Sequence, residues 1–567
     1  MLQIRCKNNN MTKSFPEGSS LLDVYQEFAN NLQMSYPVVS AKVNNTSQGL
    51  KFRLYQNRDV EFLDAREGSG RRVYVRSLCF VLYKATCDLF PGSKLFIEHP
   101  LARGYYCNFK KHEDRGKKVE EKTALTNQDV ERIRQRMQEI IDLDMPFRRN
   151  EATTEEAVRI FSDRGFSDKV KLIETSGQIY CDYYTLGDTV DYYYGPLVPS
   201  AGYLKVWGLE LYGDGLLLRV PDKNNPMILA EKIDMPRTFE VFAEKVKWDI
   251  IMRLSNAGDV NKAILNGYAS ELIQVSEALQ EKKIVQIAEE IDRRFRAEKD
   301  PIRMVLITGP SSSGKSTLCK RLSIQLLACG IRPLSFSTDD YFVNRVDTPK
   351  LPNGQYDFDN IETVDYKLME DHLTRLMKGE RVEIPEYNFV TGKREYNGKR
   401  LKLSNDSVLI IEGIHALNPL LTEKIPDSSK FKVYVSALTS ISLDDHNWIP
   451  TSDNRLLRRI IRDYNKGAFT AQQTISQWKS VCEAEEQWII PFQETADVMF
   501  NSALNIEFAV LRTHAELILS TVPKNCPEFA EAHRLLKFIH FFIPVSDKEI
   551  PPTSIMREFL GGSSFKY

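Results

Sequence analysis

Short apolar runs alternate with segments of helical spacing in the C-terminal half of the chain. Met304–Ile307 and Val408–Ile411 each hold four consecutive apolar residues, which is typical of a parallel strand buried on both faces. Residues 317–329 follow the first run and have apolar positions at helical spacing. The alternation predicts an α/β fold, in which helices flank a parallel sheet.

The pattern differs on either side of this unit. Strand-like alternation near Leu2–Cys6, Val38–Val43 and Val60–Leu63 predicts a small β-rich module. The run Phe538–Pro544 is too apolar to remain in solvent, so the C-terminal segment should pack back on the α/β unit. Five stretches are predicted: residues 1–65, β-rich; 66–225, mixed helix and strand; 226–295, a helical, heavily charged connector; 296–520, the α/β unit; and 521–567, the C-terminal extension.

Composition limits the classes of function. A chain of 567 residues is too long for one hydrophobic core, and its net charge of −1 gives no global basic surface of the kind that many nucleic-acid-binding proteins carry. The nine cysteines form no C-x-x-C pair, the N-terminus does not resemble a signal peptide, and no apolar run approaches the length of a membrane span. We therefore expect a cytoplasmic protein with reduced thiols and no membrane partner.

Residues 309–316 match the phosphate-binding pattern G-x-x-x-x-G-K-[ST] at every fixed position, between the predicted strand and helix. The glycines let backbone N–H groups converge on phosphate oxygens, and the helix N-terminus adds its dipole. A flexible Ser/Gly linker is the alternative, which the flanking elements disfavour. The predicted ATP-binding residues of this loop are Gly309, Ser311, Ser312, Ser313, Gly314, Lys315, Ser316 and Thr317. Within this set, Lys315 can reach the outer phosphates and the Ser316 hydroxyl can hold Mg²⁺.

Two acidic positions follow predicted strands. The strand near Leu334–Ser337 leads to Asp339 and Asp340, at the sheet edge where ligands of α/β proteins bind. A carboxylate there can accept a proton from an attacking hydroxyl, and only one of two adjacent residues should face the site; an acidic turn is the alternative. Glu412 ends the run 408–411 and would hold Mg²⁺ together with Ser316.

A basic helix is predicted at residues 453–463. Arg455, Arg459 and Arg462 have the spacing i, i+4, i+7, so they share one face of that helix. Such a row of guanidinium groups fits a lid that closes over transferring phosphates. A solvated helix face with aspartate partners is the alternative.

Together these motifs resemble the uridine kinase and phosphoribulokinase group of phosphate-loop kinases over roughly residues 300–520, and uridine–cytidine kinases most closely. The resemblance rests on the segments Asp339-Asp340-Tyr341-Phe342, Phe358-Asp359, Ile384-Pro385-Glu386-Tyr387-Asn388-Phe389 and Glu412-Gly413-Ile414. It implies an ATP- and Mg²⁺-dependent kinase that phosphorylates a nucleoside 5′-hydroxyl.

The resemblance also implies individual roles. Asp339 would be the general base, with Lys315 as its catalytic partner. Asp359 and Arg459 would hold ribose hydroxyls, with Asp357 as the fallback if the register slips. Tyr387 would lie against the base and Arg462 would face ATP phosphates. Two positions depart from the family, because its base-reading histidine falls on Gly392 and its second base-reading arginine has no partner near Ala468. The nucleobase is therefore left open.

The N-terminal half resembles threonyl-tRNA synthetase. Residues 1–65 are similar to its small TGS module, which implies a β-grasp-like fold, and include the segment Ala41–Asn45. Residues 66–225 are similar to its α+β editing domain. The H-x-x-x-H motif of that domain falls on Arg76–Phe80 and its Cys-x-Gly-Pro-His motif on Tyr193–Leu197, so the reactive side chains are lost and editing is not expected.

Two alternatives to a nucleoside kinase stay open. One is a kinase of another hydroxylated metabolite, such as a sugar phosphate. The other is a nucleotide-switched regulatory protein that binds RNA, although RNA is not an expected partner of a chain with this net charge. Because members of the kinase family often form homo-oligomers, the resemblance also implies a homo-oligomer.

Overall fold

A five-stranded parallel sheet forms the centre of the C-terminal half, in the order β14-β19-β13-β20-β21. The computed structural model describes residues 1–111, 124–351 and 354–566. The strands of this sheet are β13 (Met304–Thr308), β14 (Arg332–Ser337), β19 (Ser407–Glu412), β20 (Lys430–Ser436) and β21 (Val498–Asn501). The parallel pairing confirms the α/β fold predicted from the alternation of apolar runs.

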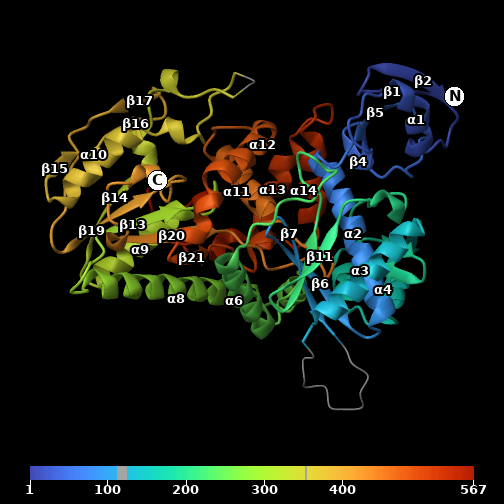
Figure 1. Ribbon diagram of the computed structural model, residues 1–567, viewed down its shortest axis with the longest axis horizontal. Helices are drawn as coiled ribbons and strands as arrows, with labels where there is room; N and C mark the ends of the chain where they lie inside the picture. The colour runs from blue at the N-terminus through green and yellow to red at the C-terminus, as the bar shows by residue number, and fades with distance from the viewer. Residues whose placement is uncertain (112–123, 352–353, 567) are drawn as a thin grey trace, which may run out of the picture.

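Helices cover both faces of this sheet (Figure 1). Val305 and Ile307 of β13 pack with α8 (Ala269–Phe295) and α9 (Lys315–Ala328) on one face. The alternate residues Met304 and Leu306 pack with α10 (Tyr366–Met377) on the other. A strand covered on both faces needs apolar residues at every position, which explains the unbroken run.

Two small antiparallel sheets extend from the α10 side of the central sheet. They are formed by β15 (Arg381–Glu383) with β18 (Arg400–Lys402), and by β16 (Glu386–Asn388) with β17 (Lys393–Glu395).

The N-terminal module is a five-stranded mixed sheet in the order β2-β1-β5-β3-β4, packed on one helix, α1 (Leu21–Phe28). Ser20 and Asp23 cap the start of α1 reciprocally, since each side chain accepts a hydrogen bond from the backbone N–H of the other. The strands are β1 (Leu2–Cys6), β2 (Met11–Phe15), β3 (Ser40–Val43), β4 (Thr46–Gln48) and β5 (Arg58–Leu63).

The next region has two antiparallel sheets and a long buried helix, α2 (Gly68–Leu89). The first sheet has the order β11-β12-β7-β6 and the second β10-β9-β8. The strands are β6 (Lys94–Leu101), β7 (Gly104–Lys110), β8 (Phe147–Thr153), β9 (Tyr180–Leu186), β10 (Thr189–Asp191), β11 (Gly208–Tyr212) and β12 (Gly215–Arg219). Helices α3 (Asn127–Asp142), α4 (Thr154–Ser162) and α5 (Ser167–Thr175) lie within this region, and α6 (Pro236–Met252) and α7 (Ala257–Leu265) lie between it and α8.

The C-terminal extension packs on helices of the α/β unit and reaches the N-terminal module. Phe538 and Phe542 each lie with their ring centroid 5.2 Å from that of Phe508. In the N-terminal module, the Asn45 side-chain amide donates to the Lys524 carbonyl of the extension at 3.1 Å. The elements involved are α11 (Thr451–Asn465), α12 (Ala471–Trp488), α13 (Glu507–Ser520), α14 (Phe529–Ile539) and α15 (Arg557–Leu560). Figure 1 shows α11, α13 and α14 between the central sheet and the N-terminal regions. In the parts of the chain that the structure describes, no helix is long and apolar enough to span a bilayer.

A buried ammonium group ties the second region to the α/β unit. Lys169 is 0% exposed and lies 2.9 Å from Asp444, 3.1 Å from Asp191 and 3.7 Å from Asp168. His446 Nδ1 lies 2.8 Å from the second oxygen of Asp191. Burial alone would lower the pKa of Lys169, but the carboxylates of Asp191 and Asp444 raise it well above its ordinary value. The two regions therefore share one buried charge cluster.

Replacing Lys169 by methionine should lower the free energy of unfolding by about 3–5 kcal/mol, because it leaves buried carboxylates without their cation. Urea denaturation followed by circular dichroism measures the change. Lys262→Met is the matched control, since Lys262 pairs with Glu174 at 3.1 Å on the surface and its loss should cost less than about 1 kcal/mol. Equal losses in the two variants would contradict a structural role for the cluster.

Candidate active site

The predicted phosphate loop joins β13 to α9 in a strained conformation. Gly309 lies so close to β20 that a Cβ would be 2.3 Å from the Val435 carbonyl oxygen. Gly314 has φ +87° and Ser312 has φ +59°, the left-handed region that side-chain-bearing residues rarely adopt. The hydroxyls of Ser312 and Ser313 are buried without a hydrogen-bond partner among the described residues. Stored strain and unused polar groups are typical of a ligand site.

Helix α11 holds the loop in this shape. Arg458 is 0% exposed, and its guanidinium donates to the Ser312 carbonyl at 3.3 Å and to the Ser502 hydroxyl at 2.9 Å. The same guanidinium forms a two-point ion pair with Glu507, one bond of which measures 2.8 Å. Arg455 donates to the Ser311 carbonyl at 3.2 Å. The loop is thus fixed from one side by two buried arginines.

The predicted row of three arginines has three different environments. Arg455 is buried and bonded to both oxygens of Glu485, at 2.6 and 2.7 Å, so it is not part of an open lid. Arg459 donates to the Ser311 hydroxyl at 3.0 Å, beside the loop. Arg462 lies nearly one turn further on and pairs with Asp463 at 3.0 Å. Its contact with ATP stays a prediction.

The acidic pair follows β14 in a short 3₁₀ turn, Thr338–Tyr341, and its two side chains diverge. The Asp340 carboxylate accepts from the Ser337 backbone N–H at 3.1 Å and so caps the turn. Asp339 accepts from the Thr338 hydroxyl at 3.3 Å. Burial raises the pKa of Asp339, and the nearby Lys315 ammonium offsets part of that rise. The arrangement therefore pairs one aspartate with the phosphate loop and uses the other structurally.

Glu412 lies at the end of β19, next to the loop. Its carboxylate accepts a hydrogen bond from the Ser316 hydroxyl at 3.3 Å, and burial raises its pKa to about 7, with Lys315 opposing the rise. Hard oxygen ligands of this kind suit Mg²⁺. Gly413 is required behind it, because a Cβ there would lie 1.8 Å from the Thr338 hydroxyl oxygen. The chain reversal after Glu412 thus packs directly on the turn that carries Asp339.

Asp359 and Arg459 lie close enough to interact near the loop. Burial raises the pKa of Asp359 to about 6, and Arg459 and Lys315 offset part of the rise. Tyr387 lies on β16 among aromatic rings, edge-on to Phe342 at 5.5 Å and to Phe389 at 5.1 Å between ring centroids. Its hydroxyl is buried and has no hydrogen-bond partner in the described segments. An unused hydroxyl is available to a ligand.

Gly392 cannot be exchanged for the family's histidine without rearrangement. It has φ +69°, and a Cβ there would lie 2.8 Å from the Arg345 Cβ. The Arg345 guanidinium donates to the Phe389 carbonyl and so covers this turn. An arginine therefore packs over the position where the family reads the base.

Three residues around the loop were not predicted. The Ser311 N–H donates to Glu485 at 2.9 Å, and the Thr317 N–H and hydroxyl donate to Glu558 at 3.3 and 2.6 Å. Ile555 would lie 2.5 Å from a Cβ on Gly314. The two glutamates come from α12 and α15, far along the chain, and no local pattern distinguishes them from surface glutamates. Carboxylates thus occupy donors that we predicted to bind phosphate.

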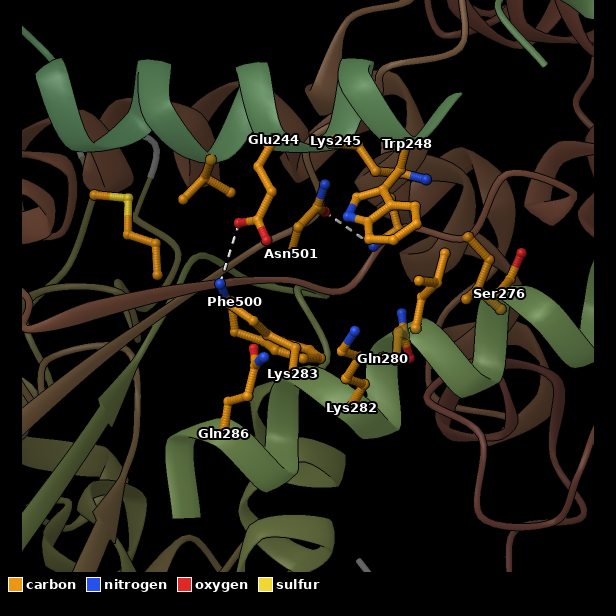
Figure 2. Close-up of a pocket in the computed structure, with 15 residues that line it drawn as sticks. Glu244, Lys245, Trp248, Ser276, Gln280, Lys282, Lys283, Gln286, Phe500 and Asn501 are labelled. Carbon is orange, nitrogen blue, oxygen red and sulfur yellow. Dashed lines mark hydrogen bonds and ion pairs between the residues drawn. The ribbon is translucent and has the colours of Figure 1, made fainter. Parts of the chain in front are cut away.

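A hollow of about 170 Å³ lies between α6 and α8, beside β21. Figure 2 shows Trp248 of α6 across from Gln280 and Lys282 of α8. Lys283 pairs with Glu244 at 3.1 Å across the two helices, and Gln280 donates to the Ser502 carbonyl at 2.8 Å. None of the predicted site residues lines this hollow.

Comparisons with known proteins divide the chain in two. Residues 304–507 match the sequence model of the Phosphoribulokinase / Uridine kinase family. A uridine kinase of Mycoplasma genitalium is 28% identical over 226 residues, which are 39% of this chain and 97% of that protein. A threonine–tRNA ligase of Syntrophomonas wolfei is 32% identical over 206 residues, 36% of this chain and 30% of the ligase. The similarity to threonine–tRNA ligases covers the N-terminal region, and the chain spans about a third of their length.

Solved structures give weaker similarity. A possible uridine kinase from Bacillus stearothermophilus has 21% sequence identity and a TM-score of 0.26, with 39% of this chain and 98% of that chain covered. A D-glycerate 3-kinase from Cryptococcus neoformans has 14% identity and a TM-score of 0.24, with 46% and 87% covered. The sequence matches alone show that residues 304–507 match the Phosphoribulokinase / Uridine kinase family and that the N-terminal region is similar to threonine–tRNA ligases, which confirms both predicted resemblances.

Replacing Glu558 by glutamine should tighten the binding of ATP with Mg²⁺ by about three- to tenfold, because it removes a negative charge from the phosphate loop and keeps the shape of the side chain. Isothermal titration calorimetry measures the dissociation constant. Glu549→Gln is the control, an exposed glutamate of the same extension. Unchanged or weaker binding in Glu558→Gln would show that this carboxylate does not compete with phosphate.

Proposed function

We propose that the protein transfers the γ-phosphoryl group of ATP to the 5′-hydroxyl of a nucleoside, giving the nucleoside monophosphate and ADP. The observation that carries this proposal is the convergence of Asp339, Glu412 and Ser316 around Lys315 at the end of the parallel sheet. A phosphate loop alone would also suit a nucleotide switch. A partly buried aspartate in the turn after β14 adds a proton acceptor, which a phosphoryl transfer to a hydroxyl group uses.

Each residue has a task in this reaction. Lys315 and the loop amides bind the phosphates of ATP, and Asp339 accepts the proton of the attacking hydroxyl, for which the rise in its pKa through burial makes it a better base. Arg459 lies beside the loop and stabilises charge on the transferring group. Ser316 and Glu412 would hold Mg²⁺, which neutralises charge on the phosphates when bound.

Asp359 with Arg459 supports recognition of ribose hydroxyls, and the unused Tyr387 hydroxyl supports contact with a base. Uridine and cytidine are the first candidates because of the family resemblance. Arg345 over Gly392 favours a second candidate, a sugar phosphate, since it supplies a cation where the family reads the base.

A panel of acceptors distinguishes these candidates. ADP release from ATP and Mg²⁺ is measured with uridine, cytidine, adenosine, inosine, guanosine, thymidine and ribulose 5-phosphate. The proposal expects release with one or more nucleosides and none with the sugar phosphate. ADP release with ribulose 5-phosphate alone would show that the substrate is a sugar phosphate and not a nucleoside. No ADP release with any acceptor would count against a kinase of these substrates.

Asp339→Asn should lower kcat by about 10²-fold or more, because asparagine cannot accept the proton, while the dissociation constant of ATP stays within a fewfold of the wild-type value. Steady-state kinetics and calorimetry measure the two quantities. Asp340→Asn is the matched control, since Asp340 caps the same turn through the Ser337 N–H. Turnover near the wild-type rate in Asp339→Asn, or an equal loss in the two variants, would overturn the assignment of the base.

A further inference from the structure

A wide cavity lies outside the kinase site, where three distant segments meet. Its volume is about 930 Å³, within the range of small-molecule sites. The walls come from the β4 end of the N-terminal module, from α2, β8 and residues 193–198 of the second region, and from α14. Figure 1 shows β4, α2 and α14 near one another, and α14 contacts β4 directly.

The charge of this cavity is strongly positive. Eight arginines and lysines line it, against the two carboxylates of Glu151 and Asp182, although the whole chain has a net charge of −1. Asp182 is already engaged, since it pairs with Arg149 at 2.6 Å. Six of the eight cations come from α2, β8 and α14: Arg72, Arg76, Arg148, Arg149, Arg534 and Lys537. Arg72 and Arg534 also have carboxylate partners, Glu531 and Asp453. Among the described residues, the lining cations without an ion-pair partner are Lys51, Arg53, Arg76, Arg148 and Lys537. Like charges gathered in this way are unfavourable unless an anion neutralises them.

Arg76 is the buried cation among those without an ion-pair partner. Its side chain is buried, with the residue 7% exposed, and it donates to the Pro196 carbonyl at 2.9 Å. Within the described chain it has no carboxylate at ion-pair distance, and neither do Arg148 and Lys537. Burial lowers the pKa of Arg76, and the nearby Arg72 and Arg534 lower it further. Burying a guanidinium group without a carboxylate partner is unfavourable, and a bound anion would offset that cost.

Aromatic rings supply a second kind of contact. The Arg76 guanidinium lies 5.3 Å from the centroid of the Tyr194 ring, and Tyr184 and Tyr193 line the same wall. Tyr55, on the opposite module, is exposed into this space. Rings beside arginines bind a flat base together with a phosphate.

Ion pairs connect the cavity to α11, and hydrogen bonds connect α11 to the phosphate loop. Arg534 lines the cavity and pairs with Asp453 of α11 at 2.6 and 2.8 Å. Glu531 bridges Arg534, at 2.5 Å, and Arg72, at 2.9 Å. Helix α11 in turn fixes the loop through Arg455 and Arg458. An anion that competes with Glu531 and Asp453 for these arginines would change the contacts of α11.

We propose that this cavity is a second binding site, for a nucleotide whose phosphates contact the arginines and whose base packs on the tyrosines, and that its occupancy alters the phosphate loop through α14 and α11. The proposal does not depend on the reaction proposed above, because none of the residues that line the cavity takes part in phosphoryl transfer. Coupling between the two sites is reciprocal in binding free energy.

Binding is tested on full-length protein carrying Lys315→Ala, which weakens the nucleotide site of the phosphate loop. Calorimetry is carried out with the 5′-mono- and triphosphates of adenosine, guanosine, cytidine and uridine, with inorganic pyrophosphate, and with a single-stranded RNA oligomer. At least one nucleotide should bind with one-to-one stoichiometry and more tightly than pyrophosphate. Adding Arg148→Ser with Lys537→Ser, two exposed cavity residues, should weaken that binding by about tenfold or more.

The matched control is Arg159→Ser with Lys94→Ser, which removes the same charge from exposed residues outside the cavity and should leave binding unchanged. Absence of nucleotide binding, binding no tighter than pyrophosphate, or equal loss in both double variants would overturn the site. Binding of the RNA oligomer and of no nucleotide would show that the ligand of the cavity is RNA and not a nucleotide.

The connection to the loop has its own readout, which needs no kinase activity. Amide hydrogen exchange of residues 309–317 is measured in the protein with natural Lys315, with and without the nucleotide found to bind the cavity. The same two measurements are made on the Arg148→Ser/Lys537→Ser variant. The proposal expects a change in protection in the first protein that is lost in the variant. Identical exchange with and without the nucleotide in the first protein, or the same change in both proteins, would overturn the coupling.

Discussion

The buried ion pair between Arg458 and Glu507 is the interaction on which the site depends most. Both side chains are almost completely removed from solvent, and breaking such a pair costs about 3–5 kcal/mol. The pair joins α11 to the start of α13, and Arg458 also bonds the loop at Ser312 and the segment after β21 at Ser502. The strained loop therefore has its shape imposed from outside, by a helix that a loop motif does not include.

Helix α11 also links the C-terminal extension to the candidate active site. Asp453 at the start of α11 binds Arg534 of the extension, and the last turn of the extension places Glu558 on Thr317. Ion pairs and hydrogen bonds thus connect the loop, the helix and the extension. Carboxylates accept hydrogen bonds from the amides of Ser311 and Thr317, which we proposed to bind phosphate. Since Glu558 at Thr317 belongs to the extension, we expect phosphate binding to be linked to movement of the extension.

Features of the site that depend on neighbouring residues in the sequence could be predicted, and those that depend on contacts between distant segments could not. The loop, Glu412 and the turn at Asp339 were predictable because each is encoded by a strand followed by a few residues, and the geometry of a parallel sheet brings those ends together. The environment of Arg455 was not predictable, because helical spacing shows which residues share a face but not that Glu485 lies against that face. The role of Glu558 and the basic cavity depend on contacts between segments hundreds of residues apart, which no local pattern records.

The most direct test of the central claim is the identity of the phosphorylated atom. The protein is incubated with γ-labelled ATP, Mg²⁺ and either the nucleoside that supports ADP release or its 5′-deoxy analogue, and the products are separated by chromatography. The account predicts label in the nucleoside 5′-monophosphate and none in any product of the analogue. Label transferred to the 5′-deoxy analogue, or ADP formed without a labelled nucleoside, would contradict it.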